Sequence, residues 1–230
     1  DGSWRFCIDF RKLNAITTKD SFPLPRIDDI LDCLAGATVF STLDLVSGFW
    51  QIPLAEDDKE KTAFSCRSGK FEFTSMPFGL CNAPSAFQRN MEFILEGLLW
   101  KICLVFIDDV IVFSSSIEQH FQHLTQVFGR ISNARMFIKV DKCKFVQPSV
   151  AFLGFVVSKE GVHSDPRLVE CVRNSARPSN KKQVERFLGL ANYYRKFVRG
   201  FASIVEPLTR LTHKGVEFVW SQECELAWLT

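Results

Sequence analysis

The sequence predicts an α+β fold made of antiparallel hairpins and amphipathic helices, and three observations point to this class. Runs rich in β-forming residues come in pairs joined by short polar connections, as residues 62–64 and 71–73 do around Ser68-Gly69. Helical patterns separate these pairs and do not alternate with single strands, as they would in a doubly wound sheet. With 47% hydrophobic residues among 230, the chain can also bury a sizeable core.

The first half of the chain is expected to form a series of short elements. Residues 4–10 alternate between apolar and polar side chains and predict a strand. Residues 28–34 have helical spacing with acidic residues in the first turn, and Gly36 ends this helix. Residues 39–43 are rich in β-forming side chains and predict a strand that ends at Asp44, after which the chain has to turn.

The second half contains longer patterns. The predicted elements are a helix after Asn82-Ala83-Pro84, strands at 102–107 and 110–113, a helix over 117–131, a strand pair within 150–157 and an amphipathic helix over 181–198. The first of these helices carries its apolar face on Phe87, Met91, Ile94 and Leu95. The last has an apolar stripe of Val184, Phe187, Leu188, Ala191, Tyr194 and Val198.

Composition narrows the function classes. The net charge is only +2, so a nucleic-acid footprint has to be local. The eight cysteines include no CxxC pair and several lie in apolar runs, which is typical of reduced, buried thiols in an intracellular protein. No run of about 18 apolar residues appears, so a membrane role is not expected. Residues 1–4 have the composition of a hairpin turn, which suggests a piece of a longer polypeptide.

Two adjacent carboxylates stand where an apolar sequence would be expected. Asp108 and Asp109 interrupt the otherwise apolar run 102–113. One interpretation is a solvated, inert hairpin tip. However, two-residue hairpin turns favour Asn-Gly or Asp-Gly, because both central residues need positive φ. An Asp pair suits oxygen ligation of a hard cation, and two adjacent like charges call for a counter-ion.

A third carboxylate, Asp44, ends another β-rich run. If its strand pairs with the strands around Asp108 and Asp109, three carboxylates converge at strand ends. Such a group can hold two Mg²⁺ ions about 3.5–4 Å apart, as in phosphoryl transfer.

Five stretches, in order along essentially the whole chain, resemble the reverse transcriptases of gypsy-class LTR retrotransposons. They are residues 40–54 (FSTLDLVSGFWQIPL), 76–84 (MPFGLCNAP), 106–110 (FIDDV), 152–155 (FLGF) and 186–197 (RFLGLANYYRKF). The resemblance implies a right-hand polymerase fold. Residues 1–18 and 52–81 would be fingers, 19–51 and 82–159 palm, and 160–230 thumb and the start of the connection.

The same resemblance implies the catalytic roles. Asp44, Asp108 and Asp109, with the backbone carbonyl of Leu45, would bind two Mg²⁺ ions, for which Mn²⁺ could substitute. Lys142 would be the cation near the leaving pyrophosphate, acting as electrostatic partner or general acid. Lys139 and Lys144 are rival candidates for that position.

Nucleotide-binding roles follow from the same motifs. Arg5 would contact the incoming triphosphate, for which a guanidinium is well suited, although an exposed Arg on a hairpin can simply be solvated. Phe49 would be a sugar gate that collides with a ribose 2′-hydroxyl; the alternative is a core aromatic beside Trp50. Phe78 would pack beside the incoming nucleotide, and Gly79 would let the backbone approach the template.

Template and primer contacts are implied for Phe106, for the primer grip at Leu153 and Gly154, and for Lys181, Lys182 and Arg186 of the thumb. The basic residues of the last helix would follow duplex phosphates without sequence preference, or else form a solvated helix face. At the position of Phe106 the family usually has Tyr. The ring would still pack against the primer end without a hydroxyl, so altered fidelity or efficiency is expected and not inactivity.

The leading hypothesis is therefore an RNA-directed and DNA-directed DNA polymerase within a retrotransposon polyprotein. Its partners would be an RNA or DNA template with annealed primer and deoxynucleoside triphosphates, with RNase H and integrase modules in the same polyprotein. It would act in cytoplasmic virus-like particles, with a nuclear phase. An RNA-templated RNA polymerase is a second hypothesis, which bulky Phe49 disfavours. A decayed or domesticated nucleic-acid-binding module is the third. His120 and His123, three apart on a helix, are expected to be packing or surface residues.

Overall fold

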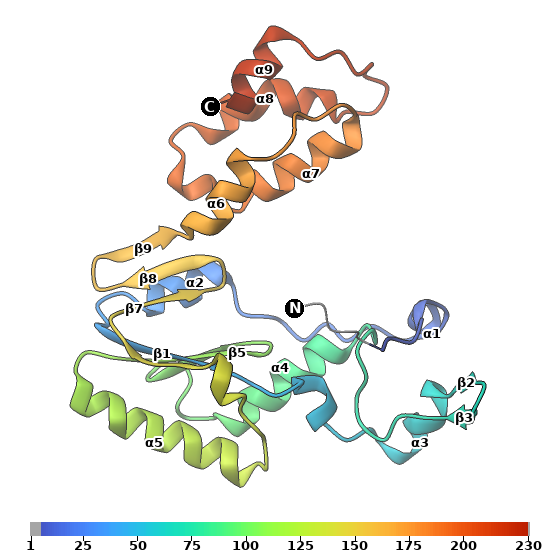
Figure 1. The fold of residues 1–230 in the computed structure, drawn as a ribbon, viewed down its shortest axis with the longest axis vertical. Helices are drawn as coiled ribbons and strands as arrows, with labels where there is room; N and C mark the ends of the chain where they lie inside the picture. The colour runs from blue at the N-terminus through green and yellow to red at the C-terminus, as the bar shows by residue number, and fades with distance from the viewer. Residues whose placement is uncertain (1–5, 230) are drawn as a thin grey trace. The chain divides into compact units, whose positions relative to one another are not determined.

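The computed structural model describes residues 6–229 and contains an antiparallel four-stranded sheet (Figure 1). The strands run in the order β4-β5-β1-β6. Their bounds are Val39–Asp44 for β1, Cys103–Phe106 for β4, Asp109–Ser114 for β5 and Lys144–Gln147 for β6. Strands β1, β4 and β5 confirm the runs predicted at 39–43, 102–107 and 110–113. Their β-branched and aromatic residues suit a pleated sheet that is buried on its faces.

Two helices pack on one face of this sheet and make the main core. Helix α4 (Ala83–Ile94) has Pro84 in its first turn, where a missing N–H is tolerated. Helix α5 (Ile117–Asn133) begins at Ser116, whose side chain accepts a hydrogen bond from the Gln119 backbone N–H. Both were predicted, and the core residues they share with the sheet include Leu43, Phe87, Met91, Leu95, Val110, Val112 and Val127. Helix α2 (Ile27–Cys33), also predicted, lies on the other side of the sheet in Figure 1.

The N-terminal region and the segment after β1 form smaller elements. They are α1 (Arg11–Ile16), the 3₁₀ turns η1 (Gly48–Gln51) and η2 (Glu60–Thr62), α3 (Glu56–Lys59), and the hairpin of β2 (Phe64–Cys66) and β3 (Gly69–Phe71). The hairpin was predicted, but the strand expected over 4–10 is wrong for the described residues 6–10, which form no strand. Their alternation instead places Phe6 against Phe64 and Phe10 against Phe73, so ring packing replaces a backbone ladder.

A second, three-stranded sheet has the order β7-β8-β9. Its strands are β7 (Ser149–Phe152), β8 (Phe155–Ser158) and β9 (Gly161–Ser164). The hairpin predicted within 150–157 is confirmed, whereas β9 was not foreseen. Leu153 and Gly154 join β7 to β8, and both have positive φ, as the tight turns of two-residue hairpins require.

The chain divides into two compact units, which among the described residues are 6–153 with 157–162, and 154–156 with 163–229. The second unit is helical: α6 (Pro166–Arg173), α7 (Lys181–Asn192), the 3₁₀ turn η4 (Arg195–Phe197), α8 (Phe201–Leu211) and α9 (Gln222–Leu229). The helix predicted over 181–198 is too long, because α7 ends at Asn192. Beyond it, Tyr193 and Tyr194 pack on the ring of Phe155, and Tyr194 donates to the carbonyl of Gly154, which draws the chain out of the helix.

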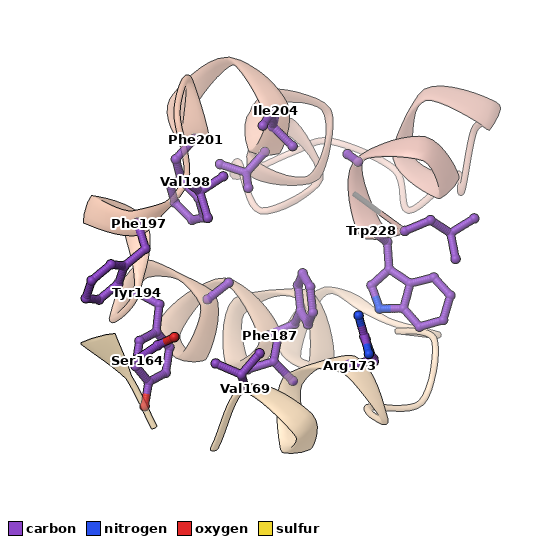
Figure 2. Close-up of a pocket in the computed structure, with 15 residues that line it drawn as sticks. Ser164, Val169, Arg173, Phe187, Tyr194, Phe197, Val198, Phe201, Ile204 and Trp228 are labelled. Carbon is purple, nitrogen blue, oxygen red and sulfur yellow. The ribbon is translucent and has the colours of Figure 1, made fainter. Parts of the chain in front are cut away.

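An apolar core holds the second unit together. It is built on Val184, Leu208, Leu211 and Cys224. Beside it lies an open, largely apolar pocket of about 460 Å³ with walls from α6, α7, α8 and α9. In Figure 2, Phe187 from α7 and Trp228 from α9 border the same space.

Two further expectations concern the whole chain. All eight cysteines are free, as expected, but only Cys103 and Cys224 are buried, so the prediction of buried thiols holds for those two alone. An apolar neighbourhood in sequence does not bury a side chain that faces outward, as at Cys66 and Cys171. Within residues 6–229, no helix is both long and apolar enough to cross a membrane.

Candidate active site

The register of the four-stranded sheet brings the predicted carboxylates together. Asp44, the last residue of β1, pairs directly with Asp109, the first residue of β5. Asp109 also pairs with Phe106 on β4, so the turn of this hairpin consists of Ile107 and Asp108. The expected Asp-Asp tip is thus shifted by one residue: Asp108 occupies the turn and Asp109 begins the strand.

Burial and neighbouring carboxylates raise the proton affinity of Asp108 and Asp109. The pKa of Asp108 is raised first by burial and then by the negative charges of Asp109 and Asp44. The pKa of Asp109 is raised by desolvation and by the charge of Asp44, while Lys142 lowers it. Asp109 is partly exposed, but desolvation and the charge of Asp44 both raise its pKa. A site that keeps all three carboxylates ionised therefore needs positive charge.

Asp108 places one of its carboxylate oxygens in a buried position. Its Oδ1 is buried without a hydrogen-bond partner among the described residues. A buried, unpartnered carboxylate oxygen is costly unless a cation or another donor binds it. The backbone of Gly48 lies so close that a Cβ there would stand 2.7 Å from Oδ1 and 2.8 Å from the ring of Phe87. Any residue with a Cβ at position 48 would collide with Asp108 Oδ1, so glycine is required there.

The turn that presents Asp108 is strained and is supported from α4. Ile107 has a φ of 55°, a left-handed conformation that is unusual for a β-branched residue. Its N–H donates to Gln88 Oε1 over 2.7 Å, and Gln88 Nε2 donates to the carbonyl of Val105 over 3.2 Å. Gln88 is fully buried and was missed from the sequence. The available signal was an amide within the apolar stripe of α4, three residues before Met91 and seven before Leu95.

Lys142 is the lysine that the structure brings to the carboxylates. It ends the 3₁₀ turn η3 (Val140–Lys142), and its Nζ lies 3.5 Å from Asp44 Oδ2. For the rival Lys139 the structure shows a backbone contact to this site, because its N–H donates to the carbonyl of Asp44 over 2.8 Å. Lys144 lies on β6, and its backbone pairs with Thr42.

The carboxylate oxygens suit a hard divalent cation, but they are not yet arranged around a single metal position. Three carboxylates, one of them with an unpartnered oxygen, provide the oxygen ligands that such ions prefer. In the described part of the chain, however, no group of three or more His, Cys, Asp or Glu side chains is already arranged to hold a metal ion. Lys142 acts instead as the counter-ion of Asp44. The side chains would have to draw together around an ion.

Aromatic rings form one wall beside the carboxylates. Phe49, in the turn η1, has its ring centroid 5.3 Å from that of Phe78 and 5.5 Å from that of Phe87. The two aromatics predicted to contact the nucleotide, Phe49 and Phe78, therefore lie together. Phe49 is partly buried against the main core, so it combines a packed ring with some exposed surface. Both interpretations of Phe49, sugar gate and core aromatic, are compatible with this position.

Two asparagines hold the loop that contains Phe78 and Gly79. Gly79 has a φ of 96°, which explains glycine at this position. Asn14 Nδ2 donates to the carbonyl of Gly79 over 2.7 Å, and Asn14 Oδ1 accepts from the N–H of Cys81 over 2.9 Å. Asn82 similarly bonds the backbone of Thr18 and Asp20. Asn14 was missed from the sequence, since no spacing pattern relates it to this loop.

The remaining predicted residues are spread more widely. Arg5 lies outside the described residues. Phe106 ends β4 next to the carboxylates, and the backbone carbonyl of Leu45 follows Asp44. Gly154 has no room for a side chain, because a Cβ would stand 3.2 Å from Tyr193 and 3.3 Å from Leu168. In the second unit Lys182 and Arg186 are exposed on α7, whereas Lys181 Nζ donates to the carbonyl of His213 over 2.9 Å.

The histidines are structural, as expected. His120 is fully buried, with Nε2 2.6 Å from Ser41 Oγ and Nδ1 2.8 Å from Ser114 Oγ. His123 Nδ1 lies 2.8 Å from the same Ser114 Oγ. Burial lowers the pKa of His120, and His123 adds to this effect. The network ties α5 to β1 and β5 through these imidazole–hydroxyl hydrogen bonds.

Comparisons with known proteins agree with this geometry. The family model described as reverse transcriptase (RNA-dependent DNA polymerase) matches residues 1–157. The chain is 47% identical over 205 residues to the retrovirus-related Pol polyprotein from transposon gypsy of Drosophila melanogaster, covering 89% of this chain and 20% of the relative. It is 43% identical over 209 residues to that from transposon opus of the same organism, covering 91% and 21%. The chain thus spans about a fifth of the length of these relatives.

Solved structures extend the likeness to the whole chain. The foamy viral protease-reverse transcriptase dRH in complex with double-stranded DNA matches with a TM-score of 0.91 and 27% identity, over 99% of this chain and 40% of the other. The foamy viral protease-reverse transcriptase in complex with an RNA/DNA hybrid matches with a TM-score of 0.86 and 26% identity, over 99% and 31%. The mixed helical and antiparallel architecture predicted from the sequence is that of these polymerases.

Proposed function

Because the chain belongs to the reverse transcriptase (RNA-dependent DNA polymerase) family, we propose that it adds deoxynucleotides to a primer 3′ end on RNA and DNA templates, as part of a retrotransposon polyprotein. The observation that carries this proposal is the pairing of Asp44 with Asp109 beside Asp108, whose buried oxygen has no hydrogen-bond partner within residues 6–229. This is the arrangement of charge that a divalent cation relieves.

Asp44, Asp108 and Asp109 would hold two Mg²⁺ ions, or Mn²⁺ in their place, with the carbonyl of Leu45 as a further ligand. When bound, such ions lower the pKa of the primer hydroxyl and neutralise the triphosphate. Lys142 neutralises Asp44 before substrate arrives. Its ammonium group would be placed to donate a proton to the departing pyrophosphate.

The aromatic wall would select the sugar. The rings of Phe78 and Phe87 contact Phe49 and fix its orientation, so its exposed edge can exclude a 2′-hydroxyl. Phe78 and Gly79 would lie against the incoming nucleotide and the template, and Arg5 against the triphosphate. Phe106 would pack on the primer end, and Leu153 with Gly154 would grip the primer strand.

The proposed subdomains are fingers at 1–18 and 52–81, palm at 19–51 and 82–159, and thumb with the start of the connection at 160–230. Lys181, Lys182 and Arg186 would contact the phosphates of the template-primer duplex. The solved relatives named above bind double-stranded DNA or an RNA/DNA hybrid, which supports this class of partner. RNase H and integrase modules in the same polyprotein, and action in cytoplasmic virus-like particles with a nuclear phase, complete the proposal.

Primer extension with the variant Asp108→Asn tests the chemistry. The substitution removes a metal ligand and leaves the basic second unit unchanged, so extension should fall by at least about a thousandfold, the equivalent of several kcal/mol. Binding of template-primer should stay within a few-fold. Asp29→Asn, at an exposed position of α2, is the matched control and should extend normally.

Substantial extension by Asp108→Asn would remove these carboxylates from the mechanism. If the unaltered chain binds template-primer but extends it with neither Mg²⁺ nor Mn²⁺, the result would favour the alternative, a nucleic-acid-binding module of the same fold.

A further inference from the structure

The side-chain amide of Gln51 joins two segments that are far apart in the sequence. Gln51 ends the turn η1, which also carries Phe49. Its Nε2 donates to the carbonyls of Val46 over 2.6 Å and of Phe137 over 3.1 Å. Its Oε1 accepts from the N–H of Phe137 over 2.6 Å. Both hydrogens and the oxygen of this amide are therefore used on backbone groups.

The segment held in this way leads to Lys142. The N–H of Val46 donates to the carbonyl of Phe137 over 3.0 Å, Leu45 pairs with Ile138 in an isolated bridge, and Lys139 donates to the carbonyl of Asp44. These contacts prolong the edge of β1 past its last residue without forming a regular strand. They end at η3, where Lys142 reaches Asp44.

The backbone near this junction is not held by regular secondary structure. Ser47, before η1, has a φ of 47°, and Arg135, before Phe137, has a φ of 56°. Non-glycine residues adopt this conformation at some cost, so surrounding contacts have to maintain it. The N–H of Phe137 donates to Gln51, and removing the amide would leave that N–H to water.

We propose that Gln51 is a positioning residue that sets the preference for deoxynucleotides. By its three hydrogen bonds it holds the turn carrying Phe49 against the segment that brings Lys142 to Asp44. Without them, η1 shifts relative to the carboxylates and the ring of Phe49 no longer closes on the 2′ position. The inference rests on the function proposed above and adds a residue to it that the sequence did not indicate.

Two variants and one control separate this role from general stabilisation. Gln51→Met keeps the length of the side chain and removes all three hydrogen bonds. Gln51→Glu keeps the acceptor for Phe137 and removes both donors. Gln147→Met is the matched control, because Gln147 lies on β6 of the same sheet and donates one hydrogen bond, to the carbonyl of Phe145 over 2.7 Å.

Single-nucleotide extension gives the decisive ratio, that of kcat/KM for a deoxynucleotide to kcat/KM for the matching ribonucleotide. Gln51→Met should lower this ratio by about tenfold, because the ring of Phe49 is displaced but still present, and a small misplacement of a discriminating group reduces selectivity without abolishing it. Gln51→Glu should fall between Gln51→Met and the unaltered chain, and Gln147→Met should keep the original ratio. An equal decrease of both activities, or no change in either, would overturn the inference.

Amide hydrogen exchange tests, without catalysis, whether Gln51 holds the two segments together. In Gln51→Met, exchange should be faster over residues 46–52 and 136–142 and unchanged in β4 and β5, at a temperature where thermal unfolding shows the variant folded. Unchanged exchange in both segments would overturn the inference that Gln51 joins them. If the unaltered chain extends no primer, the proposed function fails by itself, and hydrogen exchange still decides whether Gln51 joins the two segments. If Gln51→Met does not fold, Gln51→Glu serves for both measurements.

Discussion

The carboxylate site of the first unit, formed by Asp44, Asp108 and Asp109, and the helical second unit are stabilised in different ways. The carboxylate site combines a left-handed Ile107, a glycine packed against Asp108, and a buried carboxylate oxygen that meets no hydrogen-bond partner in the described part of the chain. The second unit instead relies on a small apolar core and on ordinary helix caps, such as Asn180, whose side chain accepts from the N–H of Gln183.

Residues that violate local rules are maintained at the site. The second unit has exceptions of its own among its described residues, Pro207 within α8 and the buried, unpartnered Oγ of Ser175, but neither involves a charged group. Substitutions should therefore act on chemistry in the first region and on stability or binding in the second.

A pair of glycines gives the largest expected contrast. In Gly48→Ala the new methyl group would overlap Asp108 and the ring of Phe87, so the carboxylate has to move and extension should fall by about a hundredfold or more. In Gly189→Ala, within α7, the new Cβ would meet no atom of the described residues within 4 Å. That change should raise the free energy of unfolding by roughly 0.5–1 kcal/mol and leave extension unaltered. Both variants need only a primer-extension assay and thermal unfolding.

Normal primer extension by Gly48→Ala would contradict this contrast between the two regions, since the close packing of Gly48 against Asp108 would then have no function. So would the loss of extension by Gly189→Ala in a folded protein.

Phe49 sharpens the comparison within the first unit. Phe49→Ala should raise ribonucleotide use relative to deoxynucleotide use by on the order of a hundredfold, because the steric block is removed. If the ring serves only the core, the substitution should instead cost about 3–5 kcal/mol of stability and depress both activities together. Phe93→Ala, at a residue that is 74% exposed on α4, is the control and should change neither quantity. The ratio of the two incorporation rates, measured beside thermal stability, decides the matter.

Much of this contrast was visible in the sequence. Strands β1, β4 and β5, the two hairpins, the two long helices of the first unit and all three carboxylates were predicted, because apolar periodicity is strong there and Asp stands out within apolar runs. Strands β6 and β9 were not foreseen. Arg5 stays a prediction, since it lies outside the described residues. Prediction was poorer in the second unit, where apolar stripes are short and interrupted. The helix predicted to reach residue 198 ends at Asn192, and helices α6, α8 and α9 were not predicted.

The supports of the site could not be read from the sequence. Asn14, Gln51 and Gln88 act through amide hydrogen bonds to backbone groups between 5 and 86 positions away. An isolated Asn or Gln carries no periodicity, so only the fold shows which backbone groups it meets. Likewise the register that places Asp44 opposite Asp109 follows from strand pairing and not from either strand alone.

The basic face of α7 gives the smallest expected effect. Replacing Lys182 and Arg186 with Ala should weaken binding alike for all template-primer sequences and reduce the salt dependence by roughly 0.7–0.9 log units for each phosphate that is no longer neutralised. Lys181→Ala should contribute less, because this ammonium group already donates to the carbonyl of His213. Binding titrations over a range of salt concentrations measure the slope. An unchanged slope would mean that these charges are simply solvated.

The central claim is that Asp108 is held in an unfavourable state that a divalent cation relieves. Its pKa is raised, so the carboxyl favours the folded state when protonated, and that contribution disappears as the pH rises from the unfolded value of about 3.9 through the higher folded value. Near pH 7 the ionised group therefore destabilises the metal-free protein, and the neutral amide of Asp108→Asn should not.

Thermal unfolding of the unaltered chain and of Asp108→Asn, each with chelator and with Mg²⁺, tests this claim most directly. With chelator near pH 7 the variant should have the higher Tm, by about 2–4 °C for each kcal/mol of repulsion removed, and the difference should shrink as the pH falls. Mg²⁺ should raise the Tm of the unaltered chain more than that of the variant. A variant that is less stable than the unaltered chain in chelator, together with no response of the unaltered chain to Mg²⁺, would contradict the account.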